Sequence, residues 1–216
     1  MAKQKKKKTT VKKRQKRSFF YRTDWHVLAG LLLFTVVTLL TRPEEATALE
    51  EAIFNFFYVS SGVLVPFFFV ITQLGSIHFL ALLALLYLFL KRYVIMLRLL
   101  MAGALAYLLT GVGKDLFGRG RPDELFGDVA VHDYVVRGPG YPSGHTAMAV
   151  AIGVVLYRYC PKKWRIPIVT LTFLAAISRM SVGVHTPLDI LGGAAIGYLS
   201  AMLFERVELR ERTNGK

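Results

Sequence analysis

The chain has 216 residues, of which 54% are hydrophobic, and it carries a formal net charge of +14 at pH 7. Its mean hydropathy is +0.43. Many apolar residues together with a strong positive charge are typical of a membrane protein with a basic end, and the length suits one domain of ordinary size. The single cysteine, Cys160, excludes an internal disulfide.

Residues 1–24 form a basic tail in which many lysines and arginines face one acidic residue, Asp24. Such a charge run is typical of a solvated, disordered segment. We expect a cytoplasmic tail that contacts anionic lipid and orients the chain by the positive-inside rule. Nucleic acid is the alternative partner, because basic tails attract phosphates, but no folded nucleic-acid-binding module follows. A secretory signal peptide is not expected, because the apolar run after Trp25 ends at Arg42 without a small-residue cleavage pattern.

Six apolar runs are expected to form membrane-spanning helices. They cover residues 25–40, 77–90, 93–112, 146–159, 164–177 and 188–204. The first run is short for a span, which ideally has about 20 apolar residues, but Tyr21 and Trp25 suit the interfacial aromatic belt. The sequence therefore predicts an all-α membrane protein with six transmembrane helices. These lie in a single domain, residues 25–206, followed by a polar cytoplasmic tail, residues 207–216.

Residues 52–75 combine an aromatic, amphipathic stretch with an apolar run that contains Pro66. With six spans and the basic tail inside, the basic turns at 91–98 and 158–165 also fall inside, and the acidic loop 42–52 falls outside. A seventh span within this segment would move both basic turns outside, against the positive-inside rule. We therefore expect short interfacial or re-entrant helices between the first two spans, with both termini in the cytoplasm.

The first candidate site motif is a pair of cations at the extracytoplasmic end of the third span. Lys114 closes that span, and Arg121 follows seven residues later, directly before Pro122. Gly118 and Gly120 indicate that the helix gives way to a loop between them. Cations at a helix C-terminus can simply complement its dipole and snorkel to the interface. The spacing alone does not decide between that role and ligand binding.

The second candidate motif is a capped helix start before the fourth span. Ser143 is expected to be the N-cap, which places the amides of Gly144 and His145 at a helix N-terminus. Such a terminus binds anions. A plain capped helix with an interfacial histidine explains the same residues equally well.

The third candidate motif opens the sixth span. Arg179 and His185 precede a predicted helix start at Thr186, and Asp189 lies in the first turn. A carboxylate four residues after a histidine can reach the imidazole, fix its tautomer and support positive charge on it. The alternative is that Asp189 only caps the helix, since Thr186-x-x-Asp189 also resembles a capping box.

Together, the three stretches resemble the three-part signature of the type 2 phosphatidic acid phosphatase superfamily. The matching residues are Lys114-x6-Arg121-Pro122, Pro142-Ser143-Gly144-His145 and Ser178-Arg179-x5-His185-x3-Asp189. The resemblance is to the integral membrane lipid phosphate phosphatase branch, of the phosphatidylglycerophosphatase B-like kind. It covers about residues 75–205 and shows no departure at any motif position.

The resemblance implies a metal-independent histidine phosphatase without a cofactor, with its active site on the extracytoplasmic face of the cell membrane. It implies that His185 is the nucleophile, that Asp189 orients it, and that His145 donates and accepts the proton. The phosphate is expected to bind Lys114, Arg121, Ser143, Gly144 and Arg179. Planar guanidinium groups match phosphate oxygens, and fixed cations supply the charge that phosphoryl transfer requires.

The remaining histidines carry weaker predictions. His26 and His78 lie at span ends and are expected to pack or face the interface. His132 and Asp133 lie in the polar loop 123–140, for which a solvated loop is the default expectation. A metal site built on the two motif histidines is conceivable, but it lacks an obvious third ligand other than the motif aspartate, and the neighbouring cations would repel a metal.

The expected substrate is a lipid phosphate anchored in the bilayer. For a bacterial chain of this branch, the resemblance suggests phosphatidylglycerol phosphate first, with undecaprenyl pyrophosphate or phosphatidic acid as alternatives. A lipid-phosphate binding or transport protein is the non-enzyme alternative. The intact histidines and aspartate argue against it, because binding alone requires only the cations.

Overall fold

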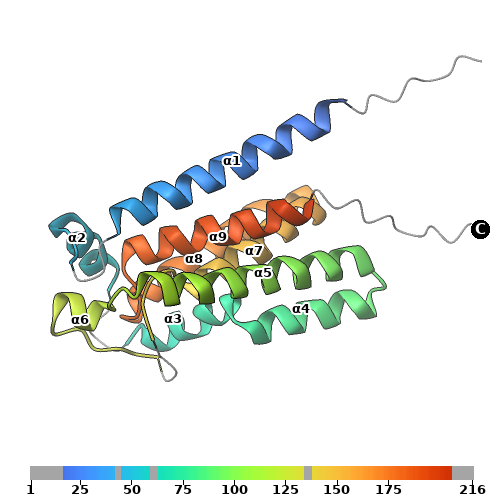
Figure 1. The fold of residues 1–216 in the computed structure, drawn as a ribbon. Helices are drawn as coiled ribbons and strands as arrows, with labels where there is room; N and C mark the ends of the chain where they lie inside the picture. The colour runs from blue at the N-terminus through green and yellow to red at the C-terminus, as the bar shows by residue number, and fades with distance from the viewer. Residues whose placement is uncertain (1–16, 42–44, 59–62, 134–137, 206–216) are drawn as a thin grey trace, which may run out of the picture.

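The computed structural model describes residues 17–41, 45–58, 63–133 and 138–205, and the side chains within them from residue 25 onward. Within these ranges every regular element is a helix. The long helices form a bundle in which they run back and forth along roughly one direction (Figure 1). They are α1 (Arg17–Leu40), α4 (Ile77–Phe89), α5 (Tyr93–Phe117), α7 (Gly144–Tyr159), α8 (Arg165–Ser181) and α9 (Pro187–Glu205). The shorter elements are α2 (Ala48–Phe57), α3 (Val65–Thr72), η1 (Gln73–Gly75), α6 (Pro122–Phe126) and η2 (Lys162–Trp164).

Each of the six predicted apolar runs is helical, and the differences lie at the helix ends. Helix α5 continues past the predicted end at residue 112 to Phe117, so Lys114 lies in its last turn. It stops there because Gly118 adopts a left-handed conformation, with φ of 55°, and donates its N–H to the carbonyl of Lys114 at 3.1 Å. Helix α1 begins at Arg17, so its first turns come from the predicted basic tail.

The segment between the first two predicted spans consists of the separate helix α2 and a second helix that is bent into α4, an arrangement compatible with the predicted re-entrant form. After α2, helix α3 and the 3₁₀ turn η1 lead directly into α4, and the two parts are bent by 56°. The break occurs at Ser76, whose side chain accepts a hydrogen bond from the amide of Phe79 at 3.1 Å and so caps α4. Together the two parts are long and apolar enough to cross a membrane, as a broken span or a re-entrant loop.

By length and composition, fewer spans are evident than the six predicted. Among the described residues, the segment 93–126 and α9 could each cross a membrane, and the bent pair could make a third. Helices α7 and α8 have only 16 and 17 residues, and residues 25–40 of α1 form another short apolar helix. Large apolar side chains are nevertheless exposed on all the long helices. A bundle that exposes this much apolar surface suits a lipid environment.

The two ends of the bundle differ in what they contain. The start of α1, the α4–α5 turn and the end of α9 lie at one end, whereas α2 and α6 lie at the other (Figure 1). At the end of the bundle where α2 and α6 lie, α7 packs closely against α9. A Cβ on Gly193 would lie 2.3 Å from the carbonyl oxygen of Ser143, and one on Gly197 would lie 2.2 Å from that of Ala147. Only glycine permits this approach, which brings the starts of the two helices together.

Candidate active site

His185 lies in the short connection between α8 and α9, buried beside the first turn of α9. Its Nδ1 is 3.3 Å from Oδ2 of Asp189, one helical turn further on. In the tautomer that carries the proton on Nδ1, the ring donates this hydrogen bond and its Nε2 keeps a free lone pair. The arrangement is that of an imidazole oriented by a carboxylate, as a nucleophile or base requires.

The carboxylate of Asp189 also caps α9. Both roles considered from the sequence, partner of His185 and helix cap, are therefore present in the structure. The amide of Thr186 donates to Oδ2 of Asp189 at 2.9 Å, and the amide of Asp189 donates to Oγ1 of Thr186 at 3.3 Å. This is a reciprocal capping box with aspartate in the place of the usual glutamate. The cap holds the carboxylate against the ring of His185, so it also positions the histidine.

Three of the predicted cations gather around His185 from different elements. Lys114 comes from the end of α5, Arg121 from the start of α6, and Arg179 from the last turn of α8. Their charges act directly on the imidazole. The histidine is therefore surrounded by positive groups that can face the oxygens of a phosphate.

Backbone carbonyls and a few side chains hold these cations in place. Arg121 donates to the carbonyls of Gly138 and Val184, each at 2.9 Å, and Lys114 donates to the carbonyl of Pro139. Arg179 binds Oγ1 of Thr72 at 2.8 Å and Oδ2 of Asp133 at 2.9 Å. The default of a solvated loop is thus wrong for Asp133, which forms an ion pair with a buried arginine.

The start of α7 faces the same region. Ser143 is fully buried and caps the helix, accepting from the amide of Thr146 at 3.4 Å. The backbone of η1 lies against this turn, because a Cβ on Gly75 would be 2.2 Å from the carbonyl oxygen of His145. His145 lies close enough to Arg179, Lys114 and Asp133 to feel their charges. The N-terminal amides of α7 and the second histidine therefore border the cation cluster.

Electrostatics keeps His185 neutral. Burial lowers the pKa of His185 well below its ordinary value, and the positive charges of Arg179, Lys114 and Arg121 lower that pKa further. A neutral imidazole can act as a nucleophile at physiological pH, whereas an imidazolium cannot.

Two site residues were not predicted from the sequence. Arg119 is fully buried and donates to Oδ1 of Asp189 at 3.3 Å and to Oγ1 of Thr186 at 2.7 Å. It also forms a bidentate ion pair with Glu50 of α2, at 2.9 and 2.8 Å. In the sequence, Thr47-x-x-Glu50 has the pattern of a capping box, which would assign Glu50 to the cap of α2. In the structure Thr47 does accept from the amide of Glu50, but the carboxylate of Glu50 binds Arg119.

The other histidines lie outside this cluster. His26 packs edge-on against Tyr198 and bonds its hydroxyl at 2.6 Å, as expected for a packing residue, and His78 is exposed. His132 stacks on Tyr58. In the described part of the chain, no group of three or more His, Cys, Asp or Glu side chains is placed to hold a metal ion.

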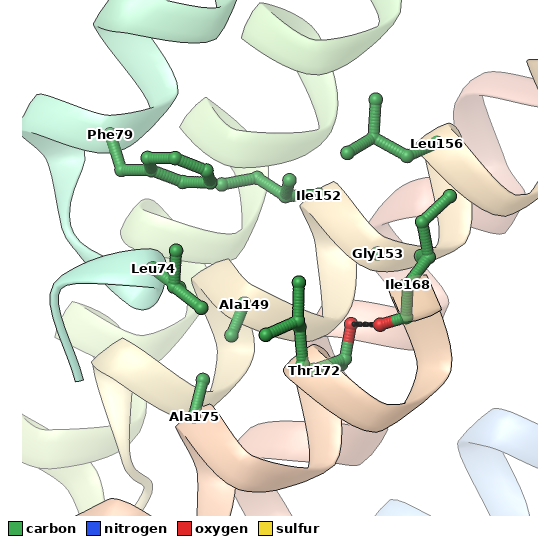
Figure 2. A pocket seen from close by; sticks show the side chains of 10 residues that line it. Leu74, Phe79, Ala149, Ile152, Gly153, Leu156, Ile168, Thr172 and Ala175 are labelled. Atoms are coloured by element: carbon green, nitrogen blue, oxygen red, sulfur yellow. Dashed lines mark hydrogen bonds between the residues drawn. The ribbon is translucent and has the colours of Figure 1, made fainter. Parts of the chain in front are cut away.

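A small apolar cavity lies beside the start of α7, between η1, α4, α7 and α8 (Figure 2). Its lining includes Leu74, next to the glycine that contacts His145, and Ala149, one turn below His145. Thr172 of α8 borders it, with its hydroxyl bonded to the carbonyl of Ile168 at 2.8 Å. The cavity therefore lies within the bundle, between the middle of α7 and its neighbouring helices.

A sequence profile of the PAP2 superfamily matches residues 95–212, more than half of the chain. The chain belongs to the PAP2 superfamily. The match includes every predicted site residue, from Lys114 to Asp189, and it confirms the resemblance found in the sequence.

Curated PAP2 relatives have several stated activities. The chain is 33% identical over 97 residues to a lipid A 4'-phosphatase of Bacteroides thetaiotaomicron, covering 42% of this chain and 43% of that protein. It is 37% identical to the undecaprenyl-diphosphatase BcrC of Bacillus subtilis, covering 31% and 34%. It is 29% identical to an undecaprenyl-diphosphatase of Sulfolobus acidocaldarius, covering 58% and 61%. The chain therefore spans less than two thirds of the length of each of these relatives.

Two solved structures share the fold over more of the chain. LpxE of Aquifex aeolicus superposes with a TM-score of 0.70 and 28% identity, covering 77% of this chain and 100% of that one. A PAP2-type phosphatidylglycerolphosphate phosphatase of Bacillus subtilis superposes with a TM-score of 0.68 and 26% identity, covering 84% and 94%. These similarities support membership of the lipid phosphatase branch of PAP2 proteins.

Proposed function

We propose that the chain hydrolyses a membrane lipid phosphate, without a metal, through a phosphohistidine intermediate. The observation that carries this proposal is the buried His185–Asp189 pair, with Nδ1 and Oδ2 3.3 Å apart, at the centre of three cations. Binding alone requires the cations. The oriented, neutral imidazole is what a nucleophile requires in addition.

In the first step, Nε2 of His185 attacks phosphorus while the bond from phosphorus to the lipid oxygen breaks. His145, which is protonated when the anionic phosphate is bound, gives this proton to the departing oxygen. Asp189 stabilises the positive charge that develops on the ring of His185. In the second step, water attacks the phosphohistidine, its proton passes to His145, and phosphate leaves from a regenerated His185.

The cations take the place that metal ions occupy in many phosphoryl-transfer enzymes. Lys114, Arg121 and Arg179 neutralise the charge on the equatorial phosphate oxygens. The hydroxyl of Ser143 and the amide of Gly144 add hydrogen bonds at the start of α7. Since all five groups are held by the fold, little reorganisation is needed as charge develops.

We place the site on the extracytoplasmic face of the cell membrane. The basic turn Lys91–Arg92 lies at the same end of the bundle as the start of α1 and the end of α9, opposite α2 and α6. By the positive-inside rule that end is cytoplasmic. Anionic lipid is the proposed partner of the basic N-terminal tail, most of which lies outside the described residues.

Phosphatidylglycerol phosphate is our first candidate substrate. A solved phosphatase named for that lipid shares the fold over 84% of this chain. Undecaprenyl pyrophosphate is the second candidate, because two of the relatives are named for its hydrolysis.

Phosphate release tests the proposal directly. Purified protein in detergent with chelator is offered phosphatidylglycerol phosphate, undecaprenyl pyrophosphate, phosphatidic acid and lipid A. We expect release from at least one lipid, fastest from phosphatidylglycerol phosphate, and none from the His185→Asn variant. Release that requires added metal, or binding of all four lipids without release, would contradict the proposal.

A further inference from the structure

A buried chain of charges runs from α2 to the candidate nucleophile. Glu50, Arg119 and Asp189 are 4%, 0% and 0% exposed. Arg119 binds both oxygens of Glu50 at 2.9 and 2.8 Å, and on its other side Oδ1 of Asp189 at 3.3 Å. The second oxygen of Asp189 faces Nδ1 of His185. Glu50 lies outside residues 95–212, which the PAP2 profile matches.

The pair of Glu50 and Arg119 also fixes the backbone that carries His185. Arg119 donates to Oγ1 of Thr186 at 2.7 Å, and the amide of Leu188 donates to Oε1 of Glu50 at 3.4 Å. Both contacts lie in the first turn of α9, directly after the histidine. Because α2 packs its buried Phe54 against α8 and α9, Glu50 reaches this turn from a rigid support.

The charges of Glu50, Arg119 and Asp189 give Glu50 a role in keeping negative charge beside His185. Arg119 alone would neutralise Asp189, and the imidazole would then face a carboxylate with little net negative potential. With Glu50 bound to the same guanidinium, the three groups sum to a charge of −1, and that charge acts on His185. The effect is strong because buried charges are poorly screened.

Charged or titratable groups from several elements surround His185, and the cations among them oppose a positive charge on its ring. These groups are Lys114 of α5, Arg121 at the start of α6, His145 of α7, Arg179 of α8, Asp189 of α9, and Asp133 of the loop after α6. A positive ring at His185 has to form among these groups. Asp189 faces the ring directly and supports that positive charge, whereas Asp133 pairs with Arg179.

We propose that Glu50 and Arg119 are positioning residues for catalysis, which hold Asp189 against His185 and keep its negative charge available to the developing phosphohistidine. This inference rests on the proposed function, because the tests that measure kcat require phosphatase activity. Both residues are buried on the far side of Asp189 and are not among the groups proposed to bind phosphate, so ground-state binding should not depend on them.

The first test is Glu50→Gln, which keeps the size and hydrogen-bonding capacity of the side chain and removes its charge. We expect kcat to fall about 10- to 100-fold, by analogy with residues that orient metal-binding histidines, with KM within about twofold. Glu50→Asp, which restores the charge, should recover part of kcat. An unchanged kcat in Glu50→Gln would overturn the proposal.

A matched control lies at the other end of α9, about 24 Å away at 1.5 Å per residue. There Glu205 is 9% exposed and pairs with Arg98 at 3.1 Å and Arg158 at 3.2 Å. Glu205→Gln removes a buried carboxylate of the same chemistry, so we expect a lower Tm with kcat unchanged. If kcat falls equally in Glu205→Gln and Glu50→Gln, loss of a buried ion pair is sufficient and the proposal fails.

A second variant guards against failure to fold. Replacing both partners of a buried ion pair with apolar residues often preserves stability, whereas removing one partner does not. Glu50→Leu/Arg119→Met removes the side chains that hold Asp189 but leaves the charge of Asp189 itself, so it tests the holding role alone. We expect its kcat to fall, because Asp189 and Thr186 are no longer held beside His185. Normal kcat in the folded double variant would contradict the proposal.

Binding of orthovanadate separates this inference from the proposed function. Vanadate resembles the transferring phosphoryl group, so its affinity should fall in Glu50→Gln by about the same factor as kcat, while the affinity for inorganic phosphate stays constant. Calorimetry measures both without turnover. If the unmodified protein hydrolyses no lipid, the proposed function fails. A lower vanadate affinity would still support the positioning role, and an unchanged affinity would refute it.

Discussion

Asp189 has two roles that a single substitution can separate. As a cap it bonds the amide of Thr186, and as a partner it faces Nδ1 of His185. Asp189→Asn keeps the size but loses the charge that supports a positive ring. We expect turnover to fall by about 10² to 10⁴, as when other catalytic histidines lose their carboxylate. A cap alone would cost about 1 kcal/mol of stability. Near-normal kcat with only a lower Tm would therefore show that Asp189 acts only as a cap.

The buried neutral state of His185 predicts how stability depends on pH. The pKa of His185 is lowered well below its ordinary value of about 6.5 by burial and then by nearby cations. Below pH 6.5 the unfolded chain therefore binds a proton that the folded chain does not. The stabilisation is fully present above pH 6.5 and is lost as pH falls towards the folded pKa, by at most about 1.4 kcal/mol per pH unit.

Thermal unfolding in detergent across this pH range measures the effect. The Tm of the unmodified protein should fall on acidification more steeply than that of His185→Asn, in which this group no longer titrates. Parallel curves for the two proteins would mean that His185 is not held neutral.

The sequence predicted the motif residues as a candidate site, but it did not predict the residues that hold them in place. Lys114, Arg121, Arg179, His145 and His185 were predicted as site residues, and the structure brings them together around one buried pair. The partnership of Glu50 and Arg119 was not predicted, because 69 positions separate them and only the packing of α2 brings them together. Local patterns identify a cap or a charge, but they do not reveal which distant side chain neutralises it.

At the scale of elements, the contact between η1 and α7 is the most sensitive. Gly75→Ala would place a Cβ 2.2 Å from the backbone carbonyl of His145, so one of the two elements must move. We expect a loss of about 1 to 3 kcal/mol of stability, as for other overpacked sites, together with lower kcat because His145 shifts. Tm and phosphate release measure the two effects.

Gly111 of α5 provides the matched control. A Cβ there has no atom within 4 Å, so Gly111→Ala should leave kcat unchanged and stabilise the helix by about 0.4 to 1 kcal/mol. If Gly75→Ala behaved like Gly111→Ala, the close contact between η1 and α7 would not be important for the site.

The apolar runs predicted where the long helices lie, whereas helix ends and breaks depend on caps and on contacts with other helices. The runs predicted all six long helices, because long uninterrupted apolar stretches allow few alternatives. The sequence predicted a new helix from residue 77 after an interfacial or re-entrant segment, but it did not predict the 56° bend between them. The bend depends on Ser76 capping a new helix and on Gly75 fitting against α7, and the second condition is a tertiary contact.

At the scale of the whole molecule, the distribution of charge predicts which end faces the cytoplasm. Asp128, after α6, and Lys162, in η2, are both exposed. In a Cys160→Ser background, a cysteine at position 128 should react with an impermeant thiol reagent on intact cells, and one at position 162 should not. The reverse pattern would place the site in the cytoplasm.

Trapping the phosphohistidine tests the central claim most directly. His145→Ala should still release p-nitrophenolate from p-nitrophenyl phosphate in a burst, because this leaving group departs without a proton, whereas water attack lacks its base. We predict about one equivalent of acid-labile, base-stable phosphate on the His145→Ala protein and none on His145→Ala/His185→Asn. Equal phosphate on both proteins would show that His185 is not the nucleophile.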